Sequence, residues 1–128
     1  MPPRKGEVRF TGLDIPRPLL HAACDLGFEY CTPIQQQSLS YTLSGRDVGG
    51  RAQTGTGKTA AFLLTALSRI INTPRSDDRP GAARVLVLAP TRELAIQIHK
   101  DAEALAKYVD AHCVAVFGGM DYRKQQRE

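Results

Sequence analysis

One feature constrains the fold of this 128-residue chain more than any other: the run Ala52-Gln53-Thr54-Gly55-Thr56-Gly57-Lys58-Thr59. It stands between a short strand candidate over residues 47–52 and a densely apolar helix candidate over residues 58–71. A glycine-rich loop between a strand and a helix is typical of a P-loop, in which backbone N–H groups and the positive end of the helix face a phosphate group. The strict P-loop pattern begins with Gly, whereas this run begins with Ala52. The run predicts a nucleoside-triphosphate site, and the alternative interpretation is a glycine-rich turn that caps a helix.

The residue types within this loop fit defined roles. Gly55 and Gly57 permit backbone angles at which successive N–H groups converge on phosphate oxygens. Lys58 is expected to reach the β- and γ-phosphates as a point charge, and the Thr59 hydroxyl is expected to ligate magnesium. Lys58 and Thr59 are therefore the candidate catalytic residues, and Thr59 is the candidate metal ligand. The loop alone does not choose between ATP and GTP, nor between a kinase, a transporter ATPase and a motor.

Helix and strand candidates alternate along the chain. Helical periodicity predicts helices over residues 17–26, 32–45 and 58–71, and Thr91 is placed to cap a fourth helix whose apolar stripe extends to Leu105. Apolar runs predict strands over residues 84–89 and 111–117, and the short, glycine-diluted stretch 47–52 is a further strand candidate. This alternation is typical of parallel βαβ units, so we expect an α/β fold with a parallel sheet and helices on both faces. Three strands are few for this class.

Composition limits the alternatives. A hydrophobic fraction of 42% and a charged fraction of 23% exclude disorder as the overall state, and the length fits one domain. The net charge of +4 suits a polyanion partner without requiring one. We expect no secretion signal and no membrane span, because no apolar run is long enough. Cys24, Cys31 and Cys113 form no C-x-x-C pair, and we expect buried, reduced thiols in a cytoplasmic protein.

Four motifs in order carry a resemblance to a known family. They are Gly27–Gln35, Ala52–Thr59, Pro90–Ala95 and Gly118-Gly119, and the isolated aromatic Phe10 lies 17 residues before the first of them. Together they resemble the Q motif, motif I, motif Ia and the GG motif of the DEAD-box RNA helicases. Motif I of that family usually begins with Ala, which accounts for the departure from the strict P-loop. The resemblance covers nearly the whole chain.

The resemblance implies ATP as the nucleotide, with magnesium. Gln35 would read adenine, since an amide offers a donor and an acceptor that match the base edge, and Phe10 would stack on the base. Without the resemblance, Gln35 would be interpreted as a solvated helix residue. The resemblance also implies that a group of strand-end residues holds an RNA backbone without reading its sequence: Pro90, Thr91, Arg92, Gly118 and Gly119. For Thr91 and Arg92 the alternatives are a helix cap and a surface charge.

The resemblance also implies how much of a helicase is present. Residues 1–128 would form the N-terminal part of the first RecA-like domain, after a short tail of about residues 1–9, with the second helicase domain absent. The sequence contains no Asp-Glu-Ala-Asp run, and Asp77-Asp78 lies in a polar loop rather than after an apolar strand. We therefore expect that the parent protein unwinds RNA with ATP, and that this chain alone neither hydrolyses ATP at a useful rate nor unwinds RNA.

Three stretches are most similar to the bacterial RhlB type of the family, namely residues 45–48, 92–101 and 121–125. That type associates with ribonuclease E in RNA-degrading assemblies through its second domain, so the contact is not expected here. Two alternatives stay open. The chain could be a stand-alone nucleotide-binding regulatory module, or it could belong to another P-loop ATPase or kinase.

Overall fold

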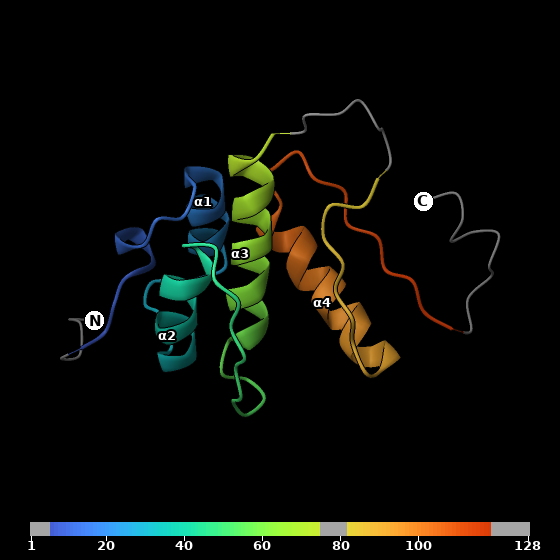
Figure 1. Ribbon diagram of the computed structural model, residues 1–128, viewed down its shortest axis with the longest axis horizontal. Helices are drawn as coiled ribbons and strands as arrows, with labels where there is room; N and C mark the ends of the chain where they lie inside the picture. Colours follow the sequence, from blue (N-terminus) through green and yellow to red (C-terminus); the bar gives the residue numbers. More distant parts are fainter. Residues whose placement is uncertain (1–5, 75–81, 119–128) are drawn as a thin grey trace.

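A computed structural model describes residues 6–74 and 82–118. A 3₁₀ turn, η1 (Phe10–Gly12), precedes the α-helices α1 (Arg17–Asp25), α2 (Pro33–Thr42), α3 (Lys58–Asn72) and α4 (Arg92–Leu105). Helix α3 stands in the centre, with α1 and α2 on one side and α4 on the other (Figure 1). Among the residues that the structure describes, no helix has the length and apolar character that would let it cross a membrane.

The helices follow the sequence predictions closely, because their end signals are local. Helix α2 begins at Pro33, a residue whose fixed φ suits the first helical position, one residue after the predicted start at residue 32. It ends at Thr42, before the predicted stop at Gly45, which has φ +86°. The Thr91 hydroxyl accepts a hydrogen bond of 3.2 Å from the Leu94 N–H, which confirms the predicted cap of α4.

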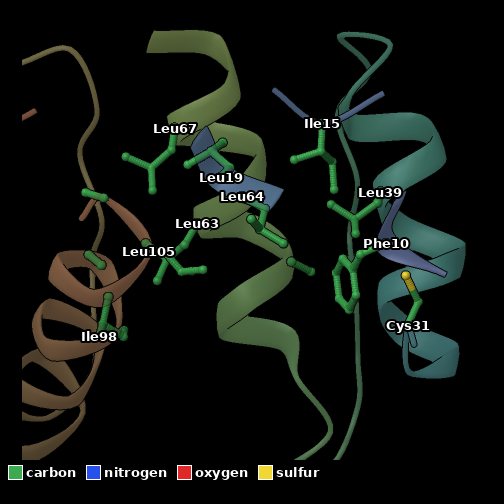
Figure 2. Packing of buried hydrophobic residues seen from close by; sticks show 13 residues of the cluster. Phe10, Ile15, Leu19, Cys31, Leu39, Leu63, Leu64, Leu67, Ile98 and Leu105 are labelled. Atoms are coloured by element: carbon green, nitrogen blue, oxygen red, sulfur yellow. The ribbon is translucent and has the colours of Figure 1, made fainter. Parts of the chain in front are cut away.

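The core forms around α3. Leu64 of this helix is fully buried, as are Leu19 of α1 and Leu39 of α2. On the other side of α3, Leu63 lies next to Leu105 of α4 (Figure 2). Helix α3 therefore buries side chains on more than one side, as its apolar circumference predicts.

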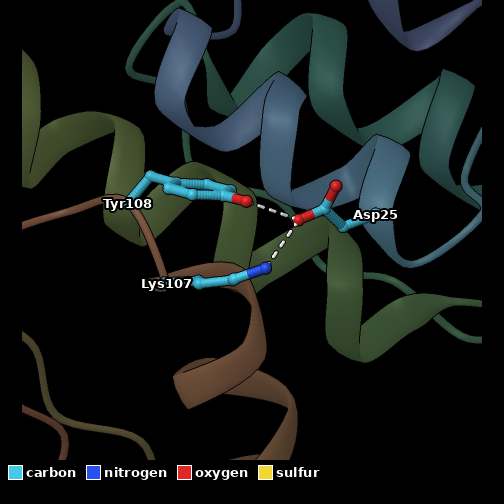
Figure 3. Close-up of polar contacts among 3 residues, drawn as sticks. All are labelled: Asp25, Lys107 and Tyr108. Carbon is cyan, nitrogen blue, oxygen red and sulfur yellow. Dashed lines mark hydrogen bonds and ion pairs between the residues drawn. The ribbon is translucent and has the colours of Figure 1, made fainter.

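A polar clasp joins the end of α1 to the end of α4 (Figure 3). Asp25 Oδ2 accepts hydrogen bonds from Lys107 Nζ at 2.9 Å and from the Tyr108 hydroxyl at 2.7 Å, and the His21 ring stacks on Tyr108 at 4.5 Å between ring centroids. The hydrogen bonds from Lys107 and Tyr108 hold the pKa of the Asp25 carboxyl below its usual value of 3.8, since they favour the charged form. The hydrogen bond to Asp25 raises the pKa of Lys107 in turn.

The three predicted strands are not confirmed. Residues 47–52, 84–89 and 111–117 form no strand ladder within residues 6–74 and 82–118, where the structure shows one isolated antiparallel bridge, between Arg9 and Tyr30. Large apolar side chains in these segments are exposed, with Leu86 at 79% and Leu88 at 84%. A parallel strand needs backbone partners at its edges and cover on both faces, and the described residues supply neither.

Two residues that were expected to belong to a tail of about residues 1–9 make contacts with the folded part of the chain. The Val8 carbonyl accepts a hydrogen bond from the Cys31 N–H at 2.8 Å, and the Arg9 guanidinium donates to the Tyr30 hydroxyl at 2.9 Å. Residues 8 and 9 therefore belong to the folded part.

The three cysteines are free thiols, as predicted. Only Cys31 is fully buried, and this burial raises the pKa of its thiol. Cys113 is partly buried, and burial followed by the Glu103 charge raises the pKa of its thiol. Cys24 is exposed, so the expectation of buried thiols is wrong there, since α1 turns this side chain outward.

Candidate functional site

The glycine-rich loop has the backbone that the sequence predicts for a phosphate cradle. Gly55 and Gly57 adopt left-handed φ values of +77° and +86°, and Gly57 directly precedes α3. A Cβ atom at Gly57 would lie 2.3 Å from Gln35 Nε2. The backbone angle therefore favours glycine at this position, and a side chain there would displace the Gln35 amide.

The loop is closed on itself in this structure. Lys58 Nζ donates a hydrogen bond to the Ala52 carbonyl, and the Thr56 hydroxyl donates to the Gln53 carbonyl at 2.7 Å. Lys58 and Ala52 are the two ends of the cradle, so this bond draws the loop together. For Lys58 to reach a phosphate group, the ammonium must exchange the Ala52 carbonyl for phosphate oxygens.

Side chains at the start of α2 donate hydrogen bonds to the backbone of the glycine-rich loop. The Thr32 hydroxyl donates to the Thr56 carbonyl at 2.7 Å, and Gln35 Nε2 donates to the Gly57 carbonyl at 3.2 Å. Gln35 Oε1 accepts a hydrogen bond of 2.9 Å from the Thr32 N–H. The fold thus brings together two motifs that lie about twenty residues apart in sequence.

These hydrogen bonds show that Gln35 is not a solvated helix residue, the alternative interpretation given by the sequence. The side chain is 4% exposed, and both of its polar heavy atoms bond the backbone. One Nε2 hydrogen remains for another acceptor. The hydrogen bond from the Thr32 hydroxyl to the loop was not predicted from the sequence, which placed Thr32 at the start of a helix and within the motif Gly27–Gln35. A signal for it was present, since a capping Thr keeps hydrogen-bonding capacity beyond the helix that it caps.

Phe10 lies away from solvent. Its ring is 2% exposed and stacks on Phe28 with ring centroids 6.0 Å apart, within the cluster that includes Leu39 and Cys31 (Figure 2). In this conformation the ring presents no exposed face to a base. Stacking on adenine stays a prediction, and it requires Phe10 to leave the core.

The residues present fit a magnesium-bound triphosphate. Thr59 lies half-buried in the first turn of α3, directly after Lys58 of the loop. The described residues contain no group of three or more His, Cys, Asp or Glu side chains able to hold a metal ion. Magnesium commonly relies on substrate phosphates with few protein ligands, so Thr59 would serve as one ligand beside the nucleotide.

A second group of predicted residues also comes together. Arg92 Nη1 donates to the Gly118 carbonyl at 3.3 Å, and the Arg92 guanidinium lies 5.8 Å from the centre of the Phe117 ring. Pro90, Thr91 and Arg92 are exposed at the start of α4. The segment before α4 and the segment at residue 118 therefore form one surface with a cation at its centre. Gly119 lies outside the described residues.

Comparison with known proteins gives consistent results. The sequence model of the family described as DEAD/DEAH box helicase matches residues 32–128. The ATP-dependent RNA helicase RhlB of Pseudomonas putida is 53% identical over 124 residues, which are 96% of this chain and 31% of the relative. RhlB of Pseudomonas aeruginosa is 50% identical over 127 residues, 98% of this chain and 32% of the relative. The chain thus spans about a third of the length of these curated relatives.

Solved structures resemble the chain over nearly its whole length. The RNA-helicase Prp28 from Chaetomium thermophilum, bound to ADP, superposes with a TM-score of 0.77 at 38% identity, covering 98% of this chain and 30% of that protein. A DEAD box protein from Methanococcus jannaschii gives a TM-score of 0.79 at 30% identity, covering 94% of this chain and 32% of the other.

Proposed function

The chain belongs to the DEAD/DEAH box helicase family, and from this premise we propose that it binds ATP with magnesium at residues 52–59 and holds an RNA backbone at residues 90–92 and 118–119. The parent protein is an RhlB-type ATP-dependent RNA helicase in this proposal, supported by RhlB relatives about half identical to the chain. Residues 1–128 then form the N-terminal part of a first RecA-like domain with a parallel sheet. We propose a cytoplasmic location for it, with RNA as its partner.

One observation carries the nucleotide part of the proposal. The Thr32 hydroxyl and the Gln35 amide bond the carbonyls of Thr56 and Gly57, so the segment proposed to read the base also fixes the loop proposed to hold the phosphates. A glycine turn that only caps a helix does not require hydrogen bonds from a second helix to its carbonyl groups. The contact therefore favours a nucleotide site over the alternative of a simple capping turn.

Several groups in and beside the loop would contribute to binding of the nucleotide. The positive N-terminus of α3 and the loop N–H groups attract the phosphates, Lys58 neutralises charge on the β- and γ-phosphates, and Thr59 orients the metal ion. Bound magnesium would neutralise further phosphate charge. Lys58 donates a hydrogen bond to the Ala52 carbonyl, so contact between Lys58 and the phosphates would require this bond to break.

The RNA part rests on the pairing of Arg92 with Gly118. An exposed guanidinium beside an exposed backbone turn suits a phosphodiester, which accepts hydrogen bonds from both without any contact to the bases. Thr91 would act mainly as the cap of α4, since its hydroxyl oxygen already accepts from the Leu94 N–H. Binding of this kind is independent of sequence and weakens with salt.

A titration with ATP and GTP tests the nucleotide site. The wild-type chain is expected to bind ATP more tightly than GTP, and Lys58→Ala to weaken binding of both by at least about tenfold through loss of charge-assisted hydrogen bonds. Lys100→Ala is the matched control, because this exposed lysine of α4 carries the same charge away from the loop. Calorimetry with each nucleotide measures the dissociation constants.

Gln35→Ala separates base reading from support of the loop. If Gln35 reads adenine, the ratio of the GTP to the ATP dissociation constant falls towards one. If Gln35 only supports the loop through Gly57, both constants rise together and their ratio is unchanged. Gln37→Ala, an exposed neighbour on α2, is the control. Tight binding with no base preference in the wild type would contradict the helicase assignment and favour another P-loop ATPase or kinase.

A phosphate-release assay tests the proposal that the parent protein hydrolyses ATP whereas this chain alone does not. We expect no RNA-stimulated turnover from the 128-residue chain, because its sequence contains no Asp-Glu-Ala-Asp run to position the metal and the attacking water. RNA-dependent release of phosphate by this chain at the rate of a full-length helicase would overturn that part of the proposal.

A further inference from the structure

The chain turns back after α4, and residues 111–118 run towards the start of that helix (Figure 1). Burial alternates along this segment: the partly buried residues are Ala111, Cys113, Ala115 and Phe117, and the exposed residues between them are His112, Val114, Val116 and Gly118. A period of two is what an extended backbone produces, because successive side chains point to opposite sides. The segment is therefore extended with one side partly covered, although it pairs with no strand among residues 6–74 and 82–118.

Two side chains of α4 hold this segment by its carbonyl groups. His99 Nε2 lies 2.9 Å from the Cys113 carbonyl oxygen, and because a carbonyl only accepts, Nε2 is the donor. Arg92 Nη1 donates to the Gly118 carbonyl at 3.3 Å. Arg92 and His99 are seven residues apart, so they lie on one face of the helix, about 10 Å apart along its axis. The two contacts place residue 113 beside the middle of α4 and residue 118 at its start.

The two contacts differ in strength. The hydrogen bond from Arg92 is exposed, and it is long for a charged donor, which normally approaches an oxygen to about 2.8 Å. The bond from His99 has an ordinary length and is partly buried, since the side chain of His99 is 29% exposed. A phosphodiester that takes the Arg92 guanidinium competes with the Gly118 carbonyl, whereas the Cys113 carbonyl lies five residues further back along the segment. His99 thus stays the anchor of the segment when Arg92 turns to RNA.

We propose, on the premise that residues 90–92 and 118–119 hold an RNA backbone, that His99 is a positioning residue for this surface. Its hydrogen bond to the Cys113 carbonyl fixes where Gly118 lies relative to Arg92. Gly118 has no side chain, so the position of its backbone decides whether a phosphate group fits between it and the guanidinium. A neutral ring suffices, because the imidazole can donate from Nε2 whether or not Nδ1 carries a proton. His99 itself touches no RNA and acts only through the segment that it holds.

Binding of a fluorescein-labelled oligouridylate to the 128-residue chain, followed by anisotropy at low salt, tests this role. His99→Ala is expected to weaken binding about three- to tenfold, the effect of losing one hydrogen bond. His99→Gln is expected to stay within about twofold of the wild type, because its amide nitrogen can donate to the same carbonyl. His112→Ala, which removes an exposed histidine from the same segment, is the matched control and should leave binding unchanged. Wild-type affinity in His99→Ala, or equal losses in His99→Ala and His99→Gln, would overturn the proposal.

A double variant separates positioning from general support of the fold. If His99 acts by placing Gly118 beside Arg92, adding His99→Ala to Arg92→Ala should weaken binding by less than about twofold, since no guanidinium remains to be paired. Independent effects that multiply would overturn the proposal. Loss of the wild-type amide NMR signals of α1–α3 in His99→Ala would also overturn it, because the ring would then support the fold as a whole. Equal binding by the wild type and Arg92→Ala, or no binding by the wild type, would instead contradict the RNA part of the proposed function, and the role of His99 would fall with it.

Discussion

The helices and two of the segments predicted as strands, 84–89 and 111–117, contain the same kinds of apolar residue and reach opposite outcomes. Leu64 of α3 is 0% exposed, whereas Leu88 of the segment 84–89 is 84% exposed. Val116 of the segment 111–117 is 72% exposed. Hydrophobicity alone therefore does not decide burial in this chain, and the availability of a packing partner does.

The difference has a simple physical origin. A helix satisfies its backbone hydrogen bonds within itself and needs only one covered face, and α3 obtains cover from three helices. A parallel strand must find its backbone partners on other strands, which are distant in sequence. The helical region is thus stable on short-range signals, whereas the strand segments depend on contacts that residues 6–74 and 82–118 do not make.

Matched leucine substitutions give the largest expected contrast. Leu64→Ala should lower the free energy of unfolding by about 2–5 kcal/mol, since it leaves a cavity in the core. Leu86→Ala, the same change at a 79% exposed site, should cost less than about 0.5 kcal/mol. Urea unfolding followed by circular dichroism measures both. A comparable cost for the two variants would show that the segment 84–89 packs into a sheet in solution.

The cap of α4 should contribute the next largest effect. Thr91→Ala removes the hydroxyl that accepts from the Leu94 N–H and should cost about 1 kcal/mol in the same unfolding experiment. Thr11→Ala, an exposed threonine of η1, is the control and should leave stability within about 0.5 kcal/mol. If Thr91→Ala is neutral, local capping does not set the start of the helix, and the contrast with the strand segments weakens.

A charge on the exposed segment should change association rather than stability. Leu88→Lys is expected to shift the free energy of unfolding by less than about 0.5 kcal/mol, because the side chain already faces solvent. It should reduce self-association at high concentration, since exposed apolar chain promotes pairing with other chains. Sedimentation velocity of the variant against the wild type measures this, and a large loss of stability would again indicate a formed sheet.

The polar clasp between α1 and α4 predicts the smallest effect, and one that depends on pH. The pKa of Asp25 is lowered, so its contribution to stability is present above the unfolded value of 3.8 and is lost as pH falls through the lower folded value. The pKa of Lys107 is raised, so its contribution is present below 10.5 and is lost only as pH rises through the raised folded value.

Asp25→Asn tests this dependence. The variant should be less stable than the wild type at pH 7, and the difference should shrink as pH falls below 3.8 and through the lowered pKa of the folded wild-type carboxyl. Asp110→Asn, an exposed aspartate just beyond the clasp, serves as the control. A gap between wild type and Asp25→Asn that stays constant as pH falls through the titration of the wild-type carboxyl would mean that the hydrogen bonds, and not the charge, hold the clasp.

Much of the site was predictable because its signals lie close together in sequence. The glycines of the loop, Lys58 and Thr59 all sit within one short run, and the positive φ angles of Gly55 and Gly57 follow from it. The juxtaposition of Arg92 and Gly118 was implied only by the family resemblance. The burial of Phe10 and the grip of Thr32 on the loop were not predicted, since each depends on residues about twenty positions away.

The sequence by itself determined the helices, the cap of α4 and the glycine-rich loop, because these depend on backbone propensities and spacings within a few residues. The tertiary structure decided which apolar residues are buried, that Gln35 and Thr32 hold the loop, and that Asp25 meets Lys107 across 82 positions of the chain. Such contacts are set by how helices pack against α3, and no local pattern encodes them. The strand segments follow the same rule, because a strand pairs with segments that are close to it in space and not with its neighbours in sequence.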